Sequence, residues 1–381
     1  MRRLSNLALL SIFCTGISVA SFAQDSVARA EQSVAELKKL DAVLTFLRKR
    51  NAIDYTITTP NGIDEGKYVT IGGIEQWITI RSEDRSNPIL LFLHGGPGDA
   101  TNPWSYAAFR PWLRQFTLVQ WDQRGAGKTL GKNGPSLGST ITLERMVSDG
   151  IELTELLRKT LNQDKVILVG HSFGSILGVL MVKSRPDLFH AFVGTGQVVD
   201  PKRNYAVAYA ELLKAAESSG EQRAIRELKE IGAPPWKHGR AYGVQRRWAN
   251  IFEHADVFLG SVFGLALAAP GYSTRDVNDW LDGQGLSAEH LVPETSALEA
   301  QKLAGKFAVP VFVIQGAQDF TTPTSLAREF VSSISAPRKA FIPIEGGGHF
   351  AVFIKSDAFL AALAARVLPL VKRPLSTRTP G

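Results

Sequence analysis

The chain has 381 residues, of which 44% are hydrophobic and 21% charged, and it carries a formal net charge of +7. This length suits one large globular core with an insertion, or two small domains. The positive excess is modest and the basic residues are scattered rather than striped beside aromatic ones, which argues against a nucleic-acid-binding protein. The single cysteine, Cys14, argues against a disulfide framework.

The N-terminus has the pattern of a secretory signal peptide. Arg2 and Arg3 form a basic start, residues 7–20 are mostly apolar but too short to span a bilayer, and Ser21-Phe-Ala23 is a small-x-small cleavage site. We expect cleavage after Ala23 and export to the periplasm or the medium, without a stable membrane anchor. An uncleaved anchor is the alternative. Cleavage would remove the only cysteine, so the mature chain could use neither a thiol nucleophile nor cysteine-ligated zinc.

Two segments of different pattern precede the main fold. Residues 25–50 predict an amphipathic leader helix that packs on the core, because apolar residues recur at helical spacing at Val34, Leu37, Leu40, Val43, Leu44 and Leu47. From Asp54 to Arg81 apolar and polar residues alternate, with turn signals at Pro60-Asn-Gly62 and Gly72-Gly73. This alternation predicts antiparallel hairpin strands.

Apolar runs then alternate with helical patterns along most of the remaining chain. Such runs indicate strands buried on both faces of a mostly parallel sheet, and they lie at Pro88–Leu93, Phe116–Trp121, Val166–Val169, Ala191–Gly194, Val309–Ile314 and Ala340–Ile344. A closing helix is expected over Ser356–Val371. The predicted fold class is therefore α/β.

Between Asp200 and Lys306 the strand rhythm stops, and helical segments rich in Ala, Leu, Arg and Trp replace it. This interval is too long for ordinary crossover helices, so we interpret it as an inserted helical cap. The expected organisation is a signal peptide (1–23), a leader helix (24–53), a core (54–199 and 306–372), a helical cap (200–305) and a flexible tail (373–381).

A serine lies between one of these strands and the helix that follows it. The strand ends in Gly170-His-Ser172-Phe-Gly174, and an amphipathic helical pattern begins directly afterwards. Glycines two residues before and after a serine allow a sharp, strained turn that exposes the hydroxyl. The pattern alone is common in glycine-bearing turns, but strand, turn and helix together favour a nucleophilic Ser172.

A serine hydroxyl needs a histidine to remove its proton and a carboxylate to orient that histidine. Asp319 follows the strand at Val309–Gly316, and His349 follows the last predicted strand. Each alone could be an ordinary loop residue, but the chain order Ser172, Asp319, His349 is the order in which this kind of sheet presents a triad. We predict these three as the catalytic residues.

Acyl transfer also requires donors aimed at the developing oxyanion. The loop His94-Gly-Gly-Pro-Gly98 follows a buried strand, and its glycines would let backbone amides approach a substrate oxygen. We predict the amides of Gly96 and Phe173 as the oxyanion hole. A glycine-rich turn without catalytic meaning is the alternative.

Taken together, these motifs resemble the α/β-hydrolase fold, and in particular its proline iminopeptidase branch. The most specific part is Trp121-Asp-Gln-Arg-Gly-Ala-Gly-Lys-Thr129, since the serine motif is shared by many lipases, esterases and peptidases. The resemblance implies that Asp122 and Arg124 brace the floor of the site through ion-paired contacts. A plain surface turn is the alternative for these two residues.

The family binds a free N-terminal amine through acidic residues of the cap, one of them in a Trp-x-x-Trp-Glu type segment. The nearest match is Trp248-Ala-Asn-Ile-Phe-Glu253, which has one extra residue and phenylalanine for the second tryptophan. The resemblance therefore implies that Glu253, with Trp248, binds substrate, the alternative being a solvated helix face. A second cap glutamate has no clear counterpart, because Val262-Phe-Gly-Leu-Ala-Leu267 is apolar where a polar segment is expected.

One motif is a decoy. Gly125-Ala-Gly-Lys-Thr129 ends like a phosphate-binding loop, but position 122 holds Asp122 where the first glycine of that motif would stand, and a carboxylate would repel phosphate. The seven histidines form no His-x-x-x-His pair, so we predict no metal. No cofactor is implied.

The sequence thus predicts an exported serine hydrolase acting on a short peptide or small molecule, and most similar to an aminopeptidase that releases N-terminal proline or a small residue. The runner-up is an esterase or amidase for small hydrophobic esters, lactones or amides, which an apolar cap without an amine anchor would suit. A third hypothesis is a non-catalytic binding protein on the same fold. It predicts a missing triad member, whereas Ser172, Asp319 and His349 are all present.

Overall fold

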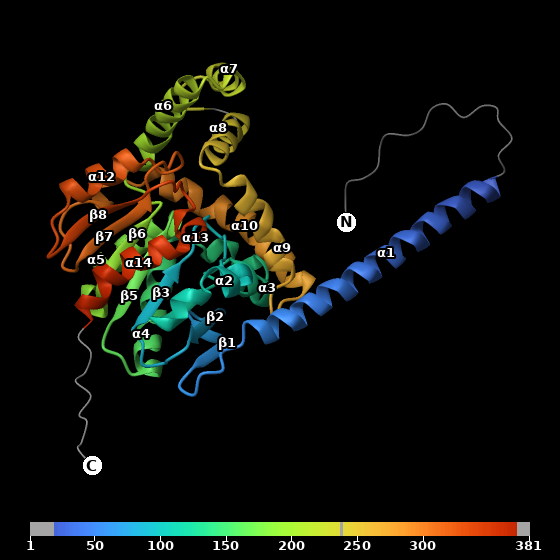
Figure 1. Cartoon of the computed structure of the whole chain (residues 1–381), viewed down its shortest axis with the longest axis horizontal. Coiled ribbons are helices and arrows are strands. Elements are labelled where there is room, and N and C mark those ends of the chain that lie inside the picture. The colour runs from blue at the N-terminus through green and yellow to red at the C-terminus, as the bar shows by residue number, and fades with distance from the viewer. Residues whose placement is uncertain (1–18, 237–238, 372–381) are drawn as a thin grey trace, which may run out of the picture.

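The computed structural model describes residues 19–236 and 239–371, and an eight-stranded sheet forms its centre (Figure 1). The strand order is β1-β2-β4-β3-β5-β6-β7-β8, with the first two pairings antiparallel and the others parallel. Each of the six predicted apolar runs overlaps one of the strands β3 to β8, which confirms the α/β class. The strands are β1 (Ile63–Ile71), β2 (Ile74–Ser82), β3 (Ile89–Leu93), β4 (Thr117–Trp121), β5 (Val166–His171), β6 (Phe189–Thr195), β7 (Val311–Gly316) and β8 (Lys339–Ile344).

Strand β3 is apolar throughout because both faces of the sheet are covered. Successive residues of β3 alternate between two core clusters, with Leu91 and Leu93 in one and Leu90 and Phe92 in the other. The first cluster includes side chains from α4 (Leu143–Leu161), α5 (Phe173–Ser184) and α12 (Thr324–Ser333). The second includes side chains from α2 (Asn102–Ala108), η1 (Arg110–Arg114) and α14 (Ser356–Val367). Alternate side chains of a strand point to opposite faces, so a strand between two helical layers has no polar face.

Outside the leader and the cap, the helices connect these strands or follow β8. The α-helices are α2 (Asn102–Ala108), α3 (Gly127–Asn133), α4 (Leu143–Leu161), α5 (Phe173–Ser184), α12 (Thr324–Ser333), α13 (Ala351–Ile354) and α14 (Ser356–Val367). The 3-10 helices are η1 (Arg110–Arg114), η2 (Pro135–Thr140), η3 (Pro186–Leu188) and η4 (Leu368–Leu370). The predicted closing helix corresponds to α14 and η4.

Within the described residues between β6 and β7, the regular elements are all helical. They are α6 (Pro201–Ser219), α7 (Gln222–Ile231), α8 (Gly239–Phe252), α9 (Asp256–Leu267), α10 (Thr274–Ala297) and α11 (Ala300–Leu303). Helices α6, α7 and α8 stand away from the sheet (Figure 1) and share a small core of their own that includes Leu212, Leu228 and Trp248. Helix α9 instead packs on the main core, where Phe258 meets Trp104 edge to face at 5.8 Å between ring centroids.

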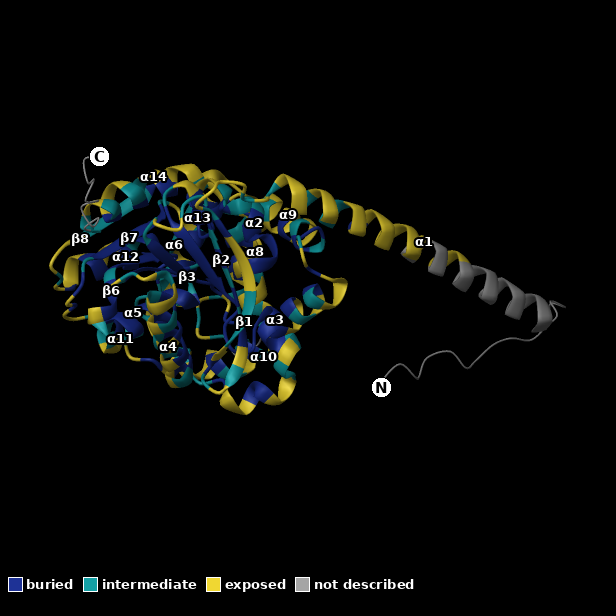
Figure 2. Ribbon diagram, turned by 90° about the horizontal axis from the view of Figure 1, so that it is seen from below, coloured by how far each residue is buried: buried dark blue, intermediate teal, exposed yellow. Residues whose placement is uncertain are grey.

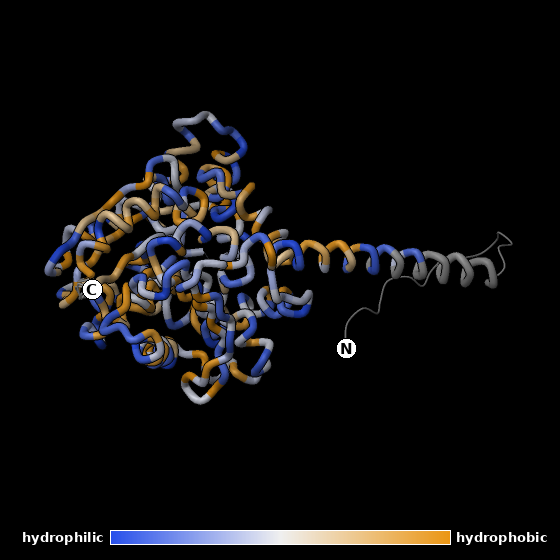
Figure 3. Tube along the Cα trace, turned by 60° about the horizontal axis from the view of Figure 1, so that its bottom comes forward, coloured by the Kyte–Doolittle hydropathy of each residue, from blue (hydrophilic) through white to orange (hydrophobic). Residues whose placement is uncertain are grey.

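The leader helix α1 (Val19–Asp54) corrects one expectation, because it does not pack along the core. It extends away from the body of the molecule and is exposed over most of its described surface (Figure 2). Leu40 and Val43 of the predicted apolar stripe are 53% and 54% exposed, whereas Leu44 is 9% exposed. The stripe is present in the sequence, but the globular body offers it no matching surface, so polar and apolar segments simply alternate along the helix (Figure 3).

The C-terminal turns of α1 are attached to the body of the molecule. Arg48 Nε donates to the carbonyl oxygen of Leu267 at 2.9 Å, and Asn51 Nδ2 donates to that of Ala268 at 2.9 Å. Most of the predicted signal peptide (residues 1–18) and the predicted tail lie outside the described residues, so export stays a prediction. None of the described helices combines the length and apolar character needed to cross a membrane.

Candidate active site

Ser172 occupies the turn between β5 and α5. Its backbone has φ 54° and ψ −120°, a conformation that non-glycine residues rarely adopt and that is often found at functional sites. The two flanking glycines are required by packing: a side chain at Gly170 would collide with the carbonyl oxygen of Gly174, and one at Gly174 would collide with that of Leu93. The sharp turn that the motif predicts is therefore the turn observed.

Asp319 and His349 follow β7 and β8, which are neighbouring parallel strands. His349 Nδ1 lies 3.1 Å from Asp319 Oδ2, and both side chains are buried. The other oxygen, Asp319 Oδ1, accepts the backbone N–H groups of Thr321 and Thr322 at 2.9 and 2.7 Å. These bonds hold the carboxylate in place, and its contact with Nδ1 selects the tautomer that leaves Nε2 of the imidazole free to accept a proton.

Ser172 and His349 line one pocket of about 320 Å³ between the sheet and the cap. Their side chains are not hydrogen-bonded to each other among the described residues, a looseness that catalytic pairs often show before substrate binds. Ring centroids of His349 and His171 are 4.9 Å apart. The lining residues are Gly96, Pro97, Asp99, His171, Ser172, Arg246, Gln284, Ala288, Val292, His349 and Phe350.

The glycine-rich loop after β3 lies against Ser172. A Cβ at Gly95 would lie 3.1 Å from that of Ser172 and 3.0 Å from His171 Nδ1, so a side chain here would crowd the turn. Gly96 lines the pocket, and Phe173 is the first residue of α5, where backbone N–H groups have no acceptor within the helix. The structure thus places both predicted oxyanion donors beside Ser172.

Glu253 lies elsewhere than the predicted amine-binding position. It is 5% exposed, does not line the pocket, and uses both carboxylate oxygens within the protein. Oε1 accepts the N–H of Phe320 and Oε2 that of His349, each at 2.7 Å. Burial, together with repulsion from Asp319, raises the pKa of Glu253 to about 8. The residue therefore ties the end of α8 to the two loops that carry Asp319 and His349.

Trp248 is also absent from the pocket. It is buried in the core shared by α6, α7 and α8, and its Nε1 donates to Glu227 at 2.8 Å. The cap side chains that do line the pocket include Arg246 and Gln284, and the core adds Asp99. Sequence reasoning missed these three. The available signal was weak: Asp99 directly follows the predicted oxyanion loop, whereas the two cap residues match no motif.

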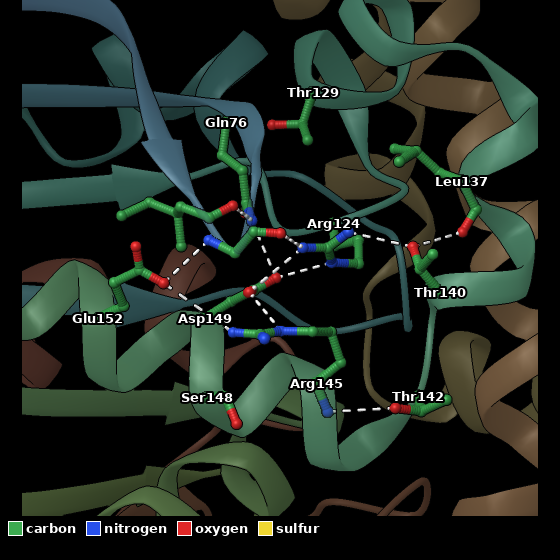
Figure 4. A network of polar contacts seen from close by, with 12 residues as sticks. Gln76, Arg124, Thr129, Leu137, Thr140, Thr142, Arg145, Ser148, Asp149 and Glu152 are labelled. Atoms are coloured by element: carbon green, nitrogen blue, oxygen red, sulfur yellow. Dashed lines mark hydrogen bonds and ion pairs between the residues drawn. The ribbon is translucent and has the colours of Figure 1, made fainter.

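Arg124 and Asp122 are buried, but they are not paired with each other. Arg124 Nε instead lies 2.8 Å from Oδ2 of Asp149 on α4, in the network shown in Figure 4. Asp122 accepts Asn102 Nδ2 at 2.7 Å and the N–H of Lys128 at 2.9 Å, and burial raises its pKa to about 7. The predicted ion-paired contact therefore holds for Arg124 alone, and its partner is a residue that no sequence motif indicates.

Lys128, the lysine of the segment that ends like a phosphate-binding loop, makes its contacts within the protein. Its Nζ lies 4.4 Å from the ring centroid of Trp77 and 4.1 Å from that of Tyr272. The same atom donates to the carbonyl oxygen of Gly271 at 2.8 Å. These contacts give the lysine a structural role between α3 and the loop that precedes α10.

Comparison with known proteins places this geometry in context. The family model described as "alpha/beta hydrolase fold" matches residues 88–356. The chain is 30% identical over 287 residues to the "Probable aminopeptidase YbaC" of Bacillus subtilis, covering 74% of this chain and 90% of that protein. It is 37% identical over 112 residues to a "Probable proline iminopeptidase" of Leptolyngbya boryana, covering 29% of this chain and 32% of the relative.

Solved structures share the fold at lower sequence identity. A proline iminopeptidase-related protein from Thermus thermophilus superposes with a TM-score of 0.56 and 20% identity, over 81% of this chain and 100% of that one. The proline iminopeptidase of Mycobacterium smegmatis gives a TM-score of 0.53 and 18% identity, over 80% of this chain and 98% of its own. At these identities the likeness shows a shared fold.

Proposed function

The chain belongs to the α/β-hydrolase fold family and is a hydrolase, and we propose that it uses Ser172, His349 and Asp319 to release an N-terminal proline or small residue from short peptides. The observation that carries the proposal is the contact of 3.1 Å between His349 Nδ1 and Asp319 Oδ2, beside a pocket that His349 shares with Ser172. The aminopeptidase version is supported by two of the relatives, one named a probable aminopeptidase and the other a probable proline iminopeptidase.

The reaction follows from the roles of these groups. His349 Nε2 takes the hydroxyl proton as Ser172 Oγ attacks the carbonyl carbon of the first residue, and Asp319 stabilises the imidazolium. The amides of Gly96 and Phe173 stabilise the negative oxygen of the tetrahedral intermediate. The imidazolium then returns the proton to the departing amine, leaving an acyl ester on Ser172. A water molecule, deprotonated by His349, hydrolyses that ester and frees the amino acid.

Glu253 supports this chemistry indirectly in our proposal. By accepting the N–H groups of Phe320 and His349, it fixes the backbone next to the acid and at the base. The N-terminal sequence further supports export: Arg2 and Arg3 precede an apolar stretch and a small-x-small site ending at Ala23. We therefore propose that the enzyme acts outside the cytoplasm on peptides or other small molecules.

A two-part experiment tests the proposal. A fluorophosphonate should label the wild-type protein but not Ser172→Ala, because the reagent needs an activated serine. Proline arylamide and a short-chain aryl ester are then assayed side by side. Proline release that disappears in Ser172→Ala supports the aminopeptidase. Ester turnover without proline release would favour the esterase alternative, and equal labelling of wild type and Ser172→Ala would reject the triad.

A further inference from the structure

We propose that the catalytic pocket binds a zwitterionic short peptide at both ends, with Asp99 holding its α-ammonium group and Arg246 its terminal carboxylate. This inference rests on the proposed function, since it assigns parts of the peptide substrate to residues around Ser172. The charged residues that line the pocket support it. Among the lining residues, Asp99 is the only carboxylate and Arg246 the only permanently charged cation.

The position of Asp99 suits an amine next to the scissile carbonyl. A Cβ built at Gly96, the proposed oxyanion donor, would lie 3.2 Å from Asp99 Cβ, so the two residues are in close contact. In an α-amino acyl group, the amine is bonded to the carbon adjacent to the carbonyl. A residue that binds this amine must therefore lie close to the oxyanion hole, as Asp99 does, whereas Glu253 does not line the pocket.

The Asp99 carboxylate has only part of its bonding capacity filled. Its Oδ1 accepts Trp280 Nε1 at 3.2 Å and Gln284 Nε2 at 3.3 Å, and both donors are neutral. No cationic side chain of the described residues lies within ion-pair distance of it. Burial raises its pKa to about 6, and the charge of Arg246, which lies beyond ion-pair distance, acts in the opposite direction. The carboxylate therefore has no directly paired counter-charge among the described residues, and a substrate ammonium would supply one.

This charge has a consequence for selectivity. A carboxylate without a direct ion-pair partner beside the oxyanion hole opposes the negative charge that develops in the transition state. A substrate ammonium bound to Asp99 neutralises it, whereas an N-acylated peptide or a simple ester cannot. Substrates with a free α-amine should therefore be favoured in the chemical step as well as in binding.

Arg246 supplies the opposite charge from the cap. It belongs to α8, and its guanidinium carbon lies 5.8 Å from the ring centroid of Phe350, the residue after the catalytic base. It forms no ion pair within the described part of the chain, whereas its neighbour Arg247 pairs with Glu227. A guanidinium binds a carboxylate through two parallel hydrogen bonds, and a pocket of about 320 Å³ suits a small ligand. These features together favour a dipeptide.

The experiment compares three peptides that differ only at their ends: Pro-Ala, N-acetyl-Pro-Ala and Pro-Ala amide. Wild-type kcat/KM should be highest for Pro-Ala. Asp99→Asn should lower kcat/KM for Pro-Ala by about 10- to 100-fold, as expected for loss of a charge-assisted hydrogen bond. It should also reduce the ratio of kcat/KM for Pro-Ala to kcat/KM for N-acetyl-Pro-Ala. Arg246→Gln should likewise reduce the ratio of kcat/KM for Pro-Ala to kcat/KM for Pro-Ala amide.

Two variants of like charge serve as controls. Arg247→Gln removes the neighbouring arginine of α8, and Asp282→Asn removes an exposed carboxylate of α10. Both should leave the ratios between the three peptides unchanged. The rate of fluorophosphonate labelling and the thermal midpoint check that each variant is folded, and Asp99→Ser serves the same test if Asp99→Asn does not fold.

The outcomes separate this inference from the proposed function. If wild type prefers the free amine and Asp99→Asn keeps that preference, the Asp99 assignment is wrong while the aminopeptidase stands. If Arg246→Gln preserves the preference for a free carboxylate, or wild type shows none, the Arg246 assignment is wrong. If wild type cleaves the acetylated peptide as well as Pro-Ala, the aminopeptidase proposal itself fails.

Discussion

Substituting Asp149 by alanine should destabilise the protein strongly. The carboxylate is completely buried and accepts Arg124 Nε at 2.8 Å, Arg145 Nε at 2.8 Å and Gln76 Nε2 at 2.9 Å (Figure 4). In Asp149→Ala, the guanidinium of Arg124 would remain 2% exposed without a counter-charge. Its remaining partners would be the carbonyl oxygen of Gly72 and the hydroxyl of Thr140, both neutral.

The expected loss follows from this burial. Removing one partner of a buried ion pair typically costs about 3–5 kcal/mol, because the other charge stays buried and unpaired. The Arg145 side chain is 36% exposed, so water can solvate it when the carboxylate is absent, and Arg145→Ala should cost no more than about 1 kcal/mol. Asp149→Ala should therefore be at least threefold more destabilising than Arg145→Ala.

Urea unfolding followed by tryptophan fluorescence measures both differences. In a double-mutant cycle, Arg124→Met combined with Asp149→Ala should be less destabilising than the sum of the single variants, since the double variant buries no unpaired charge. An Asp149→Ala loss below about 1 kcal/mol, or additive effects in the cycle, would refute the assignment of a buried, tightly coupled pair.

Three further predictions follow from other contacts. Glu253→Gln leaves one of two buried backbone N–H groups, at Phe320 or His349, without an acceptor. The free energy of unfolding should fall by about 1–3 kcal/mol, and kcat should fall by a larger factor than KM changes. An unchanged kcat would contradict the role of Glu253 in positioning the triad. The folded-state pKa of Asp122, about 7, exceeds the unfolded value of about 4. The stabilising contribution of Asp122 is therefore complete below pH 4 and is lost as pH rises through 7. Between these pH values the urea midpoint should decline less for Asp122→Asn than for wild type, and parallel pH profiles of the two proteins would refute this. Leu40→Ser should leave the thermal midpoint nearly unchanged, because Leu40 is 53% exposed; a large decrease in the midpoint would mean that this side chain packs against another surface.

Local patterns were sufficient for the sheet and for the candidate triad. A strand covered on both faces must be apolar at consecutive positions, so a run such as Val166–Val169 predicts a strand with other elements packed on both of its faces. The turn at Ser172 is equally local, because Gly170 and Gly174 contact each other across it. Asp319 and His349 were predicted correctly as neighbours since loops after adjacent parallel strands emerge at the same edge of the sheet.

The partners of charged and amphipathic segments were not determined locally. Helix α1 has an apolar stripe, but whether a surface exists to receive it depends on the rest of the molecule, and for Leu40 none does. Arg124 was expected to be ion-paired, yet only the packing of α4 reveals that Asp149 is its partner. A charged side chain can pair with any opposite charge that folding brings near, and sequence spacing does not show which.

Some features of the site are predictable from the sequence, and others depend on tertiary packing. The sequence by itself determined the fold class and the chemical groups predicted to break the bond, because these depend on strand periodicity, turn geometry and chain order. Only the tertiary structure decided how the cap meets the core. It directs Glu253 onto the backbone of Phe320 and His349 and leaves Asp99 and Arg246 facing the pocket, since contacts between distant segments depend on packing rather than on local pattern.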